Sequence, residues 1–205
     1  MYLYATSVHW LQLHYIELLA TITGLLYVIY TIRENNLLWL FGIISSGLFV
    51  CVFFNSGIFA YATLYIYYVL IGIYGWVNWT RKIPGREGGQ GNIVIRRASV
   101  TIIVSCLAIS ILLAVPLYFI LKEYTDSDIA LFDAILTSSG MVATWMLTQK
   151  IFEQWLFWIV IDLLSFGVMI FKGLYPSSLL FLAYTILAIK GYFEWKKALI
   201  HPVTR

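Results

Sequence analysis

Charged side chains are scarce in this chain of 205 residues. Only 11% of its residues are charged, whereas 61% are apolar and 18% are aromatic. A water-soluble domain of this length needs far more polar surface to enclose its core. The composition therefore excludes a soluble protein and predicts an integral membrane protein.

Cysteine, histidine and proline are also rare, with 2, 3 and 4 copies respectively. Both cysteines, Cys51 and Cys106, fall within apolar runs, and no CxxC pair or Cys/His group has the spacing of a metal site. The glycine-rich stretch 84–92 lacks the Gly-Lys-Ser/Thr ending of a phosphate-binding loop, so we interpret it as a flexible linker. No nucleophile, base and orienting group occur together, so we expect no catalytic residues, no metal and no cofactor.

Continuous apolar runs of about 17 to 22 residues recur along the chain, without the period-2 alternation of barrel strands. As helices with a rise of about 1.5 Å per residue, they reach across about 30 Å of hydrocarbon. We expect membrane spans at 16–32, 37–54, 60–79, 98–120, 131–148, 155–171 and 177–195. The predicted fold class is an all-α integral membrane protein with seven transmembrane helices.

Part of the chain repeats. Residues 17–79 fall without a gap on residues 133–195 after a shift of 116 positions, with 14 identities over 63 aligned positions. Chance gives roughly four or five in a composition this biased. The second copy begins four spans after the first, so both enter the membrane in the same direction, which predicts a parallel 3+1+3 repeat. Duplicated bundles of this kind are typical of transporters with a substrate site between the copies.

The repeat and the linker together predict the domain organisation. We expect an N-terminal interfacial segment (1–15), a first three-helix bundle (16–82), a cytoplasmic linker (83–97), a connector transmembrane helix (98–121), a second three-helix bundle (131–197) and a cytoplasmic tail (198–205). The first segment has no basic n-region and no small-residue cleavage site, which favours an amphipathic interfacial helix over a signal peptide.

Basic residues predict the orientation of the spans. One side receives Lys122 and Lys172, and Lys190 lies inside the last span. The other side receives the remaining ten: Arg33, Arg81, Lys82, Arg86, Arg96, Arg97, Lys150, Lys196, Lys197 and Arg205. The positive-inside rule therefore places the N-terminus outside and the C-terminus in the cytoplasm. The net charge of +3 reflects this topology and gives no indication of nucleic-acid binding.

Two aromatic stripes recur at three- and four-residue spacing in the third and seventh spans. The glycines of both stripes predict close helix packing, and their terminal tryptophans, Trp79 and Trp195, fit an interfacial belt. The aromatic residues nearer the middle of the membrane are Tyr65, Tyr68, Phe181 and Tyr184. Phenol hydroxyls there need partners, so both packing and substrate binding remain open for these four.

Asp162 lies in the middle of the sixth span, where an ionised carboxylate costs about 2.5 to 3.5 kcal/mol. It should therefore face a cavity or a partner. Trp158 lies one turn away on the same face, and an aromatic ring beside a carboxylate suits a delocalised organic cation. A structural aspartate, bonded to a tyrosine or to Lys190, is the alternative. The repeat pairs Asp162 with Ser46, so the copies differ at this level.

Several segments resemble the PnuC family of bacterial vitamin transporters: 39–44, 53–60, 73–79, 153–162, 171–175 and 191–195. The paired helix ends Gly75-Trp-Val-Asn-Trp79 and Gly191-Tyr-Phe-Glu-Trp195 are the most specific. The resemblance implies a fold related to the SWEET sugar transporters, a homotrimer in the bacterial inner membrane, and inward facilitated diffusion of nicotinamide riboside. With the aromatic and acidic residues above, it implies a substrate site of Tyr65, Tyr68, Trp158, Asp162, Phe181 and Tyr184.

Departures from the family leave the substrate open. Members often carry an amide side chain where this sequence has Tyr65 and a Gln where it has Thr144. A related branch, PnuT, carries thiamine, which is also a cationic aromatic vitamin. A heptahelical receptor or a membrane-embedded enzyme are rivals from other classes, but a receptor needs no internal repeat and an enzyme needs a reactive constellation.

Overall fold

The computed structural model describes residues 16, 19–55, 57, 59–81, 94–125 and 128–200. The expected interfacial segment 1–15, most of the linker (82–93) and the tail 201–205 lie outside the described residues, together with the basic residues they carry. Within the described residues, regular structure is helical, apart from one isolated β-bridge between Arg96 and Ile151.

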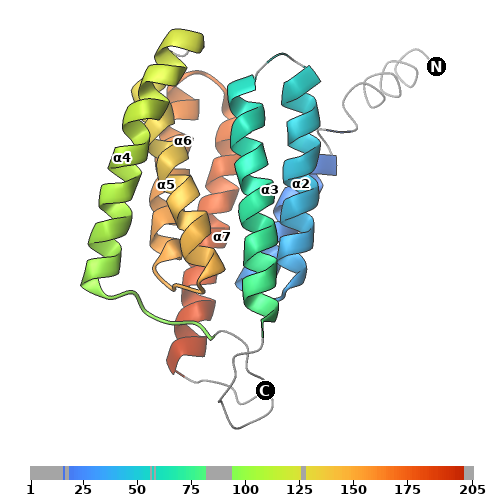
Figure 1. The fold of residues 1–205 in the computed structure, drawn as a ribbon, viewed down its shortest axis with the longest axis vertical. Helices are drawn as coiled ribbons and strands as arrows, with labels where there is room; N and C mark the ends of the chain where they lie inside the picture. The colour runs from blue at the N-terminus through green and yellow to red at the C-terminus, as the bar shows by residue number, and fades with distance from the viewer. Residues whose placement is uncertain are drawn as a thin grey trace, which may run out of the picture. The chain divides into compact units, whose positions relative to one another are not determined.

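Each expected span coincides with a helix (Figure 1). The helices are Leu19–Ile32, α2 (Leu37–Asn55), α3 (Phe59–Thr80), α4 (Val100–Tyr124), α5 (Ala130–Thr148), α6 (Gln154–Phe171) and α7 (Tyr175–Ile200). The all-α prediction is confirmed.

Four of the helices, α2, α4, α5 and α6, are long and apolar enough to cross a membrane by length and composition. The helices α3 and α7 contain 22 and 26 residues, which exceeds the roughly 20 needed to cross hydrocarbon. Both helices contain tyrosines and polar residues. Such residues occur in membrane helices where they face protein or a substrate pathway.

The chain forms two compact units, Met1–Trp76 and Val77–Arg205. In the second unit, α4 packs against α5, α5 against α6, and α6 against α7. Half of the α5 span is buried inside the protein, more than in α4 or α6. Small residues such as Ala134, Ser138 and Gly140 allow this, because they let neighbouring backbones approach. The helix α5 is therefore the centre of its unit.

The turns before α2 and before α6 have the same backbone structure, although they belong to different units. Glu34 and Lys150 both adopt a left-handed conformation, with φ of 53° and 50°. In the first turn, the amides of residues 34, 35, 38 and 39 donate to the carbonyls of residues 31, 30, 35 and 36, respectively. In the second turn, the amides of residues 150, 151, 154 and 155 donate to the carbonyls of residues 147, 146, 151 and 152, so each bond recurs 116 positions later. Further along, Gly57 and Gly173 share φ values of 73° and 71°. These shared features support the repeat.

The paired glycines near the ends of α3 and α7 admit a tryptophan ring. A Cβ placed on Gly75 lies 2.3 Å from the Trp39 ring, and one placed on Gly191 lies 2.4 Å from the Trp155 ring. Any other residue type would collide with these rings. Close packing, as predicted, is therefore the role of both glycines.

The terminal tryptophans of the two stripes differ from the expected interfacial belt. Trp79 and Trp195 are 1% and 0% exposed, and their ring centroids lie 6.4 Å apart. A second ring contact, of 5.6 Å, joins Trp195 to Trp155. The three indoles thus pack together inside the second unit, where lipid headgroups do not reach.

Candidate functional site

One face of α6 carries three side chains of different chemistry. Gln154, Trp158 and Asp162 follow one another at intervals of four residues, which places them one helical turn apart on the same face. Asp162 is 7% exposed and Gln154 is fully buried, while Trp158 is half-buried. Along the helix axis the stripe covers two turns, or about 12 Å. It presents an amide, an aromatic ring and a carboxylate in that order.

The carboxylate of Asp162 has a phenol neighbour on the adjacent helix. It lies close enough to Tyr184 of α7 to interact electrostatically with the phenol. Lys190, the alternative partner considered from sequence, is exposed on α7. The tyrosine is therefore the neighbour that the structure supplies.

The aromatic residues of α7 also come together. The rings of Phe181 and Tyr184 meet edge to face, with centroids 6.4 Å apart. The hydroxyl of Thr185 donates to the Phe181 carbonyl at 2.9 Å, which ties this polar group into the helix itself. Phe181 and Tyr184 therefore form an aromatic pair on α7, and Tyr184 is the member of the pair that interacts with Asp162.

The other two predicted residues, Tyr65 and Tyr68, lie in the first unit. Their rings are 5.8 Å apart and meet edge to face. Tyr65 also stacks against Phe53 at 5.4 Å and contacts Phe49 at 4.9 Å, so it is part of an aromatic cluster shared by α2 and α3. A fourth ring, Tyr67, contacts Tyr68 at 5.5 Å. The structure thus divides the six predicted residues between the units: Tyr65 and Tyr68 lie in the first, and Trp158, Asp162, Phe181 and Tyr184 lie in the second.

Gln154 is a candidate that the sequence interpretation missed. Neither its amide nitrogen nor its amide oxygen has a hydrogen-bond partner among the described residues, although the side chain is fully buried. Such a group costs about 1 to 3 kcal/mol unless something completes its hydrogen bonds. The indole nitrogen of Trp155 is unsatisfied in the same way within the described part of the chain. A ligand with neighbouring donor and acceptor atoms would satisfy the amide.

The repeat gives an independent reason to single out Gln154. Its counterpart 116 positions earlier is Leu38, which is also fully buried and has the same backbone hydrogen bond. Leucine fills this place in the first copy, so packing alone does not demand an amide. The difference between Leu38 and Gln154 at paired positions is the feature of the sequence that points to Gln154.

Metal binding has no evident site in the described residues, where no three His, Cys, Asp or Glu side chains could hold an ion together. The groups that gather around α6 and α7 are aromatic rings, an amide and one carboxylate. This set suits an organic molecule with a flat ring and polar substituents.

Known proteins are similar to this chain in sequence and fold. Residues 14–197 match the model of the nicotinamide mononucleotide transporter family. The nicotinamide riboside transporter PnuC of Escherichia coli K12 is 25% identical over 205 aligned positions, covering 90% of this chain and 86% of the relative. The protein of the same name from Neisseria mucosa is 23% identical, covering 87% and 70% respectively.

A solved structure has a similar fold. The crystal structure described as that of the vitamin B3 transporter PnuC superimposes with a TM-score of 0.71 at 20% identity, covering 94% of this chain and 85% of the other. The fold and the apolar helices are those of a multi-pass membrane protein. The chain belongs to the nicotinamide mononucleotide transporter family. It is therefore a transporter and not an enzyme, as the sequence predicted.

Proposed function

We propose that this protein carries nicotinamide riboside across the bacterial inner membrane. Family membership supports transport of a nicotinamide nucleoside or nucleotide, and the relatives named above are nicotinamide riboside transporters. Nothing in these comparisons favours the thiamine alternative. The observation that carries the proposal is the stripe of Gln154, Trp158 and Asp162 on α6.

The order of groups on α6 matches the order of groups in the proposed substrate. The buried amide of Gln154 can pair with a primary carboxamide, donating to its oxygen and accepting from its nitrogen. One turn further, Trp158 offers a face to the cationic pyridinium ring. Asp162 then offsets the positive charge or accepts hydrogen bonds from the ribose hydroxyls.

The remaining predicted residues have supporting roles in this proposal. Phe181 and Tyr184 lie on α7 beside Asp162 and would contact the ring or the ribose. Tyr65 and Tyr68 are proposed as substrate contacts from the first unit, on the strength of the repeat, which pairs Tyr68 with Tyr184. All the rings would give the apolar, flat contact area that a pyridinium needs.

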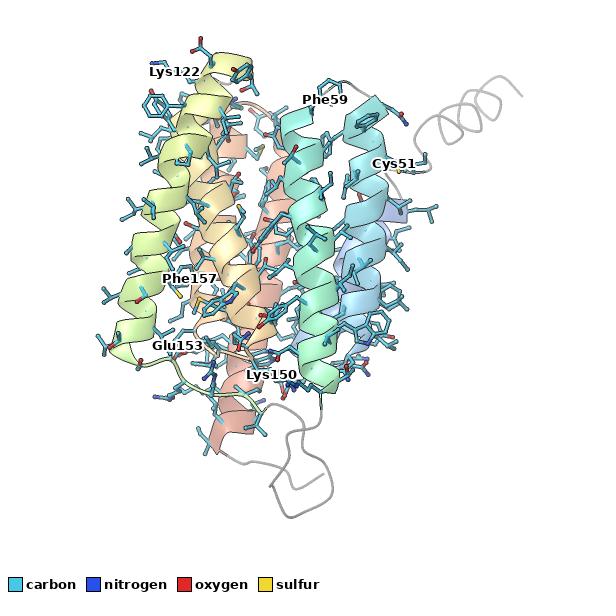
Figure 2. The ribbon with its side chains drawn as sticks, viewed as in Figure 1. Cys51, Phe59, Lys122, Lys150, Glu153 and Phe157 are labelled. Atoms are coloured by element: carbon cyan, nitrogen blue, oxygen red, sulfur yellow. The ribbon has the colours of Figure 1, made fainter. Side chains whose placement is uncertain are left out.

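The proposal includes the direction and energetics of transport. With no coupling-ion or nucleotide site recognised, we propose facilitated diffusion by alternating access, a homotrimeric assembly, an external N-terminus and a cytoplasmic C-terminus. In support of this orientation, Lys122 and Lys150, which the basic-residue count assigns to opposite sides, lie at opposite ends of the second unit (Figure 2).

The test is uptake into liposomes that contain only this protein. Radiolabelled nicotinamide riboside should enter without ATP or an ion gradient, and thiamine should enter much more slowly. Preference for thiamine would overturn the substrate assignment, and uptake of neither would overturn both. Asp162→Asn should weaken nicotinamide riboside binding about 5- to 150-fold, because a hydrogen bond to a charged group contributes about 1 to 3 kcal/mol. Wild-type affinity in a folded Asp162→Asn protein would assign Asp162 to structure.

A further inference from the structure

The last turn of α3 is attached to the end of α5 by side chains. The amide nitrogen of Asn78 donates to the Thr148 carbonyl at 2.8 Å, and the indole nitrogen of Trp79 donates to the Leu147 carbonyl at 3.2 Å. Both carbonyls belong to the last turn of α5, where helix geometry leaves carbonyl groups without partners inside the helix, although the Leu147 carbonyl also accepts from the Lys150 amide of the following turn. Side chains of α3 therefore complete the hydrogen bonds of the α5 end.

Lys150 adds a third contact at the same place. Its ammonium nitrogen lies 4.3 Å from the centroid of the Trp79 ring, within the range of a cation–π interaction. The lysine is 8% exposed, which is unusual for a side chain that normally reaches solvent. It also holds a left-handed φ of 50°, which costs free energy for most residues other than glycine and asparagine.

The turn that carries Lys150 is held from a second direction by the end of the linker. The Arg96 amide donates to the Lys150 carbonyl at 3.0 Å, and the Phe152 amide donates to the Arg96 carbonyl at 2.9 Å. The side chain of Glu153 accepts from the Ala98 amide at 2.7 Å. Lys150 and Glu153 both lie where α5 passes into α6 (Figure 2). The turn is thus a fixed support from which Lys150 reaches Trp79.

We infer that Asn78, Trp79 and Lys150 form a latch that closes this end of the transporter and releases when it opens. The inference rests on the proposed alternating access, which requires helix ends on each side to separate in turn. The two hydrogen bonds and the cation–π contact of the latch involve polar or charged groups, so water can replace them when the ends part, whereas Trp79 also packs against Trp195. Lys150 acts as a positioning residue that holds the Trp79 indole over the end of α5.

A cysteine at Thr148 reports whether the latch is closed. Thr148 is fully buried, and its carbonyl accepts the Asn78 hydrogen bond, which Thr148→Cys leaves intact. In a background with Cys51→Ala and Cys106→Ala, a polar maleimide labels this cysteine in nanodiscs, where both sides of the protein are accessible. Lys150→Asn should raise the labelling rate about fivefold, the effect of losing roughly 1 kcal/mol from the closed state. Asparagine tolerates the left-handed backbone, so the substitution removes the ammonium without adding strain.

Two controls isolate the role of the ammonium. Lys150→Arg keeps a cation over the ring and should label at about the wild-type rate. Glu34→Asn alters the repeat-paired residue, which has the same φ, and should change nothing. Wild-type labelling in a folded Lys150→Asn protein would overturn the latch. Should that protein not fold, Asn78→Ala, which deletes one hydrogen bond, must raise the labelling rate or the inference is wrong. Labelling needs no substrate, so failure of the latch is distinct from failure of uptake by the wild type.

Discussion

Replacing Gln154 with leucine should stabilise the ligand-free protein and weaken substrate binding at once. The amide is fully buried and neither polar atom has a partner among the described residues. Removing an unsatisfied buried amide recovers about 1 to 3 kcal/mol, and leucine has a similar volume. Leu38 shows that a leucine packs at the paired position of the first copy. A structural glutamine would give the opposite sign, because its loss would break native contacts.

Thermal unfolding of the detergent-solubilised protein and a binding titration measure the two effects. Without ligand, Gln154→Leu should raise the apparent Tm by several degrees at a fixed scan rate. Its affinity for nicotinamide riboside should fall about 10- to 100-fold, because the carboxamide loses both hydrogen bonds. Nicotinic acid riboside has a carboxylate in place of the carboxamide, so it has no donor for the Gln154 side-chain oxygen. Its affinity should therefore differ little between the wild type and Gln154→Leu.

The mirror substitution is the matched control. Leu38→Gln places an amide in the paired buried position of the first copy, so it should lower stability by about 1 to 3 kcal/mol and add no affinity. The reasoning is refuted if Gln154→Leu lowers the Tm, or if it binds nicotinamide riboside as the wild type does. A lowered Tm would show that the amide supports the fold, and unchanged affinity would show that the ligand does not reach it.

Three further predictions concern packing, the aromatic pair and a helix cap. Gly191→Ala should lower stability by about 1 to 3 kcal/mol in thermal unfolding, because the added Cβ lies 2.4 Å from the Trp155 ring. Gly167→Ala is the control and should leave stability unchanged, because no atom lies within 4 Å of its added Cβ. In binding titrations, Tyr184→Ala and Tyr68→Ala should each weaken binding more than the corresponding Phe variants, which keep the ring, and normal binding by both Ala variants would leave these stripes as packing alone. Ser99→Ala should cost about 1 kcal/mol in the same unfolding assay, because the Ser99 hydroxyl accepts from the Ile102 amide at the start of α4.

Helix positions were predictable because the membrane imposes long apolar runs. The expected span 37–54 corresponds to Leu37–Asn55, and 155–171 to Gln154–Phe171. Larger differences occur at α7, which continues to Ile200, five residues past the expected end of its span. The hydropathy pattern stops at the polar residues there, but intrahelical hydrogen bonds continue through them. The sequence thus predicts which residues lie in the apolar layer of the membrane better than it predicts where a helix ends.

The candidate site was only partly predictable. Asp162 stands out in the sequence because a carboxylate interrupts an apolar run. Gln154 does not, because it lies between a glutamate and a tryptophan at the polar edge of its span. The sequence places Lys150 among the loop charges, yet it is buried against Trp79. Burial and missing partners are properties of the packed chain, and no spacing rule reveals them.

Paired positions show that the two copies of the repeat carry different functional groups. Their backbones agree in detail at the turns that precede α2 and α6, so the fold does not require different side chains there. Yet Leu38, Ser46 and Glu34 of the first copy are replaced in the second by Gln154, Asp162 and Lys150. Conversely, tyrosines at 61 and 67 in the first copy give way to a serine and an alanine. The first copy is rich in phenols, and the second holds the buried amide, carboxylate and ammonium. A nucleoside also has two different ends, a flat cation and a set of hydroxyl groups. Two identical copies would bind it equally well in either orientation, whereas copies with different functional groups can favour one orientation.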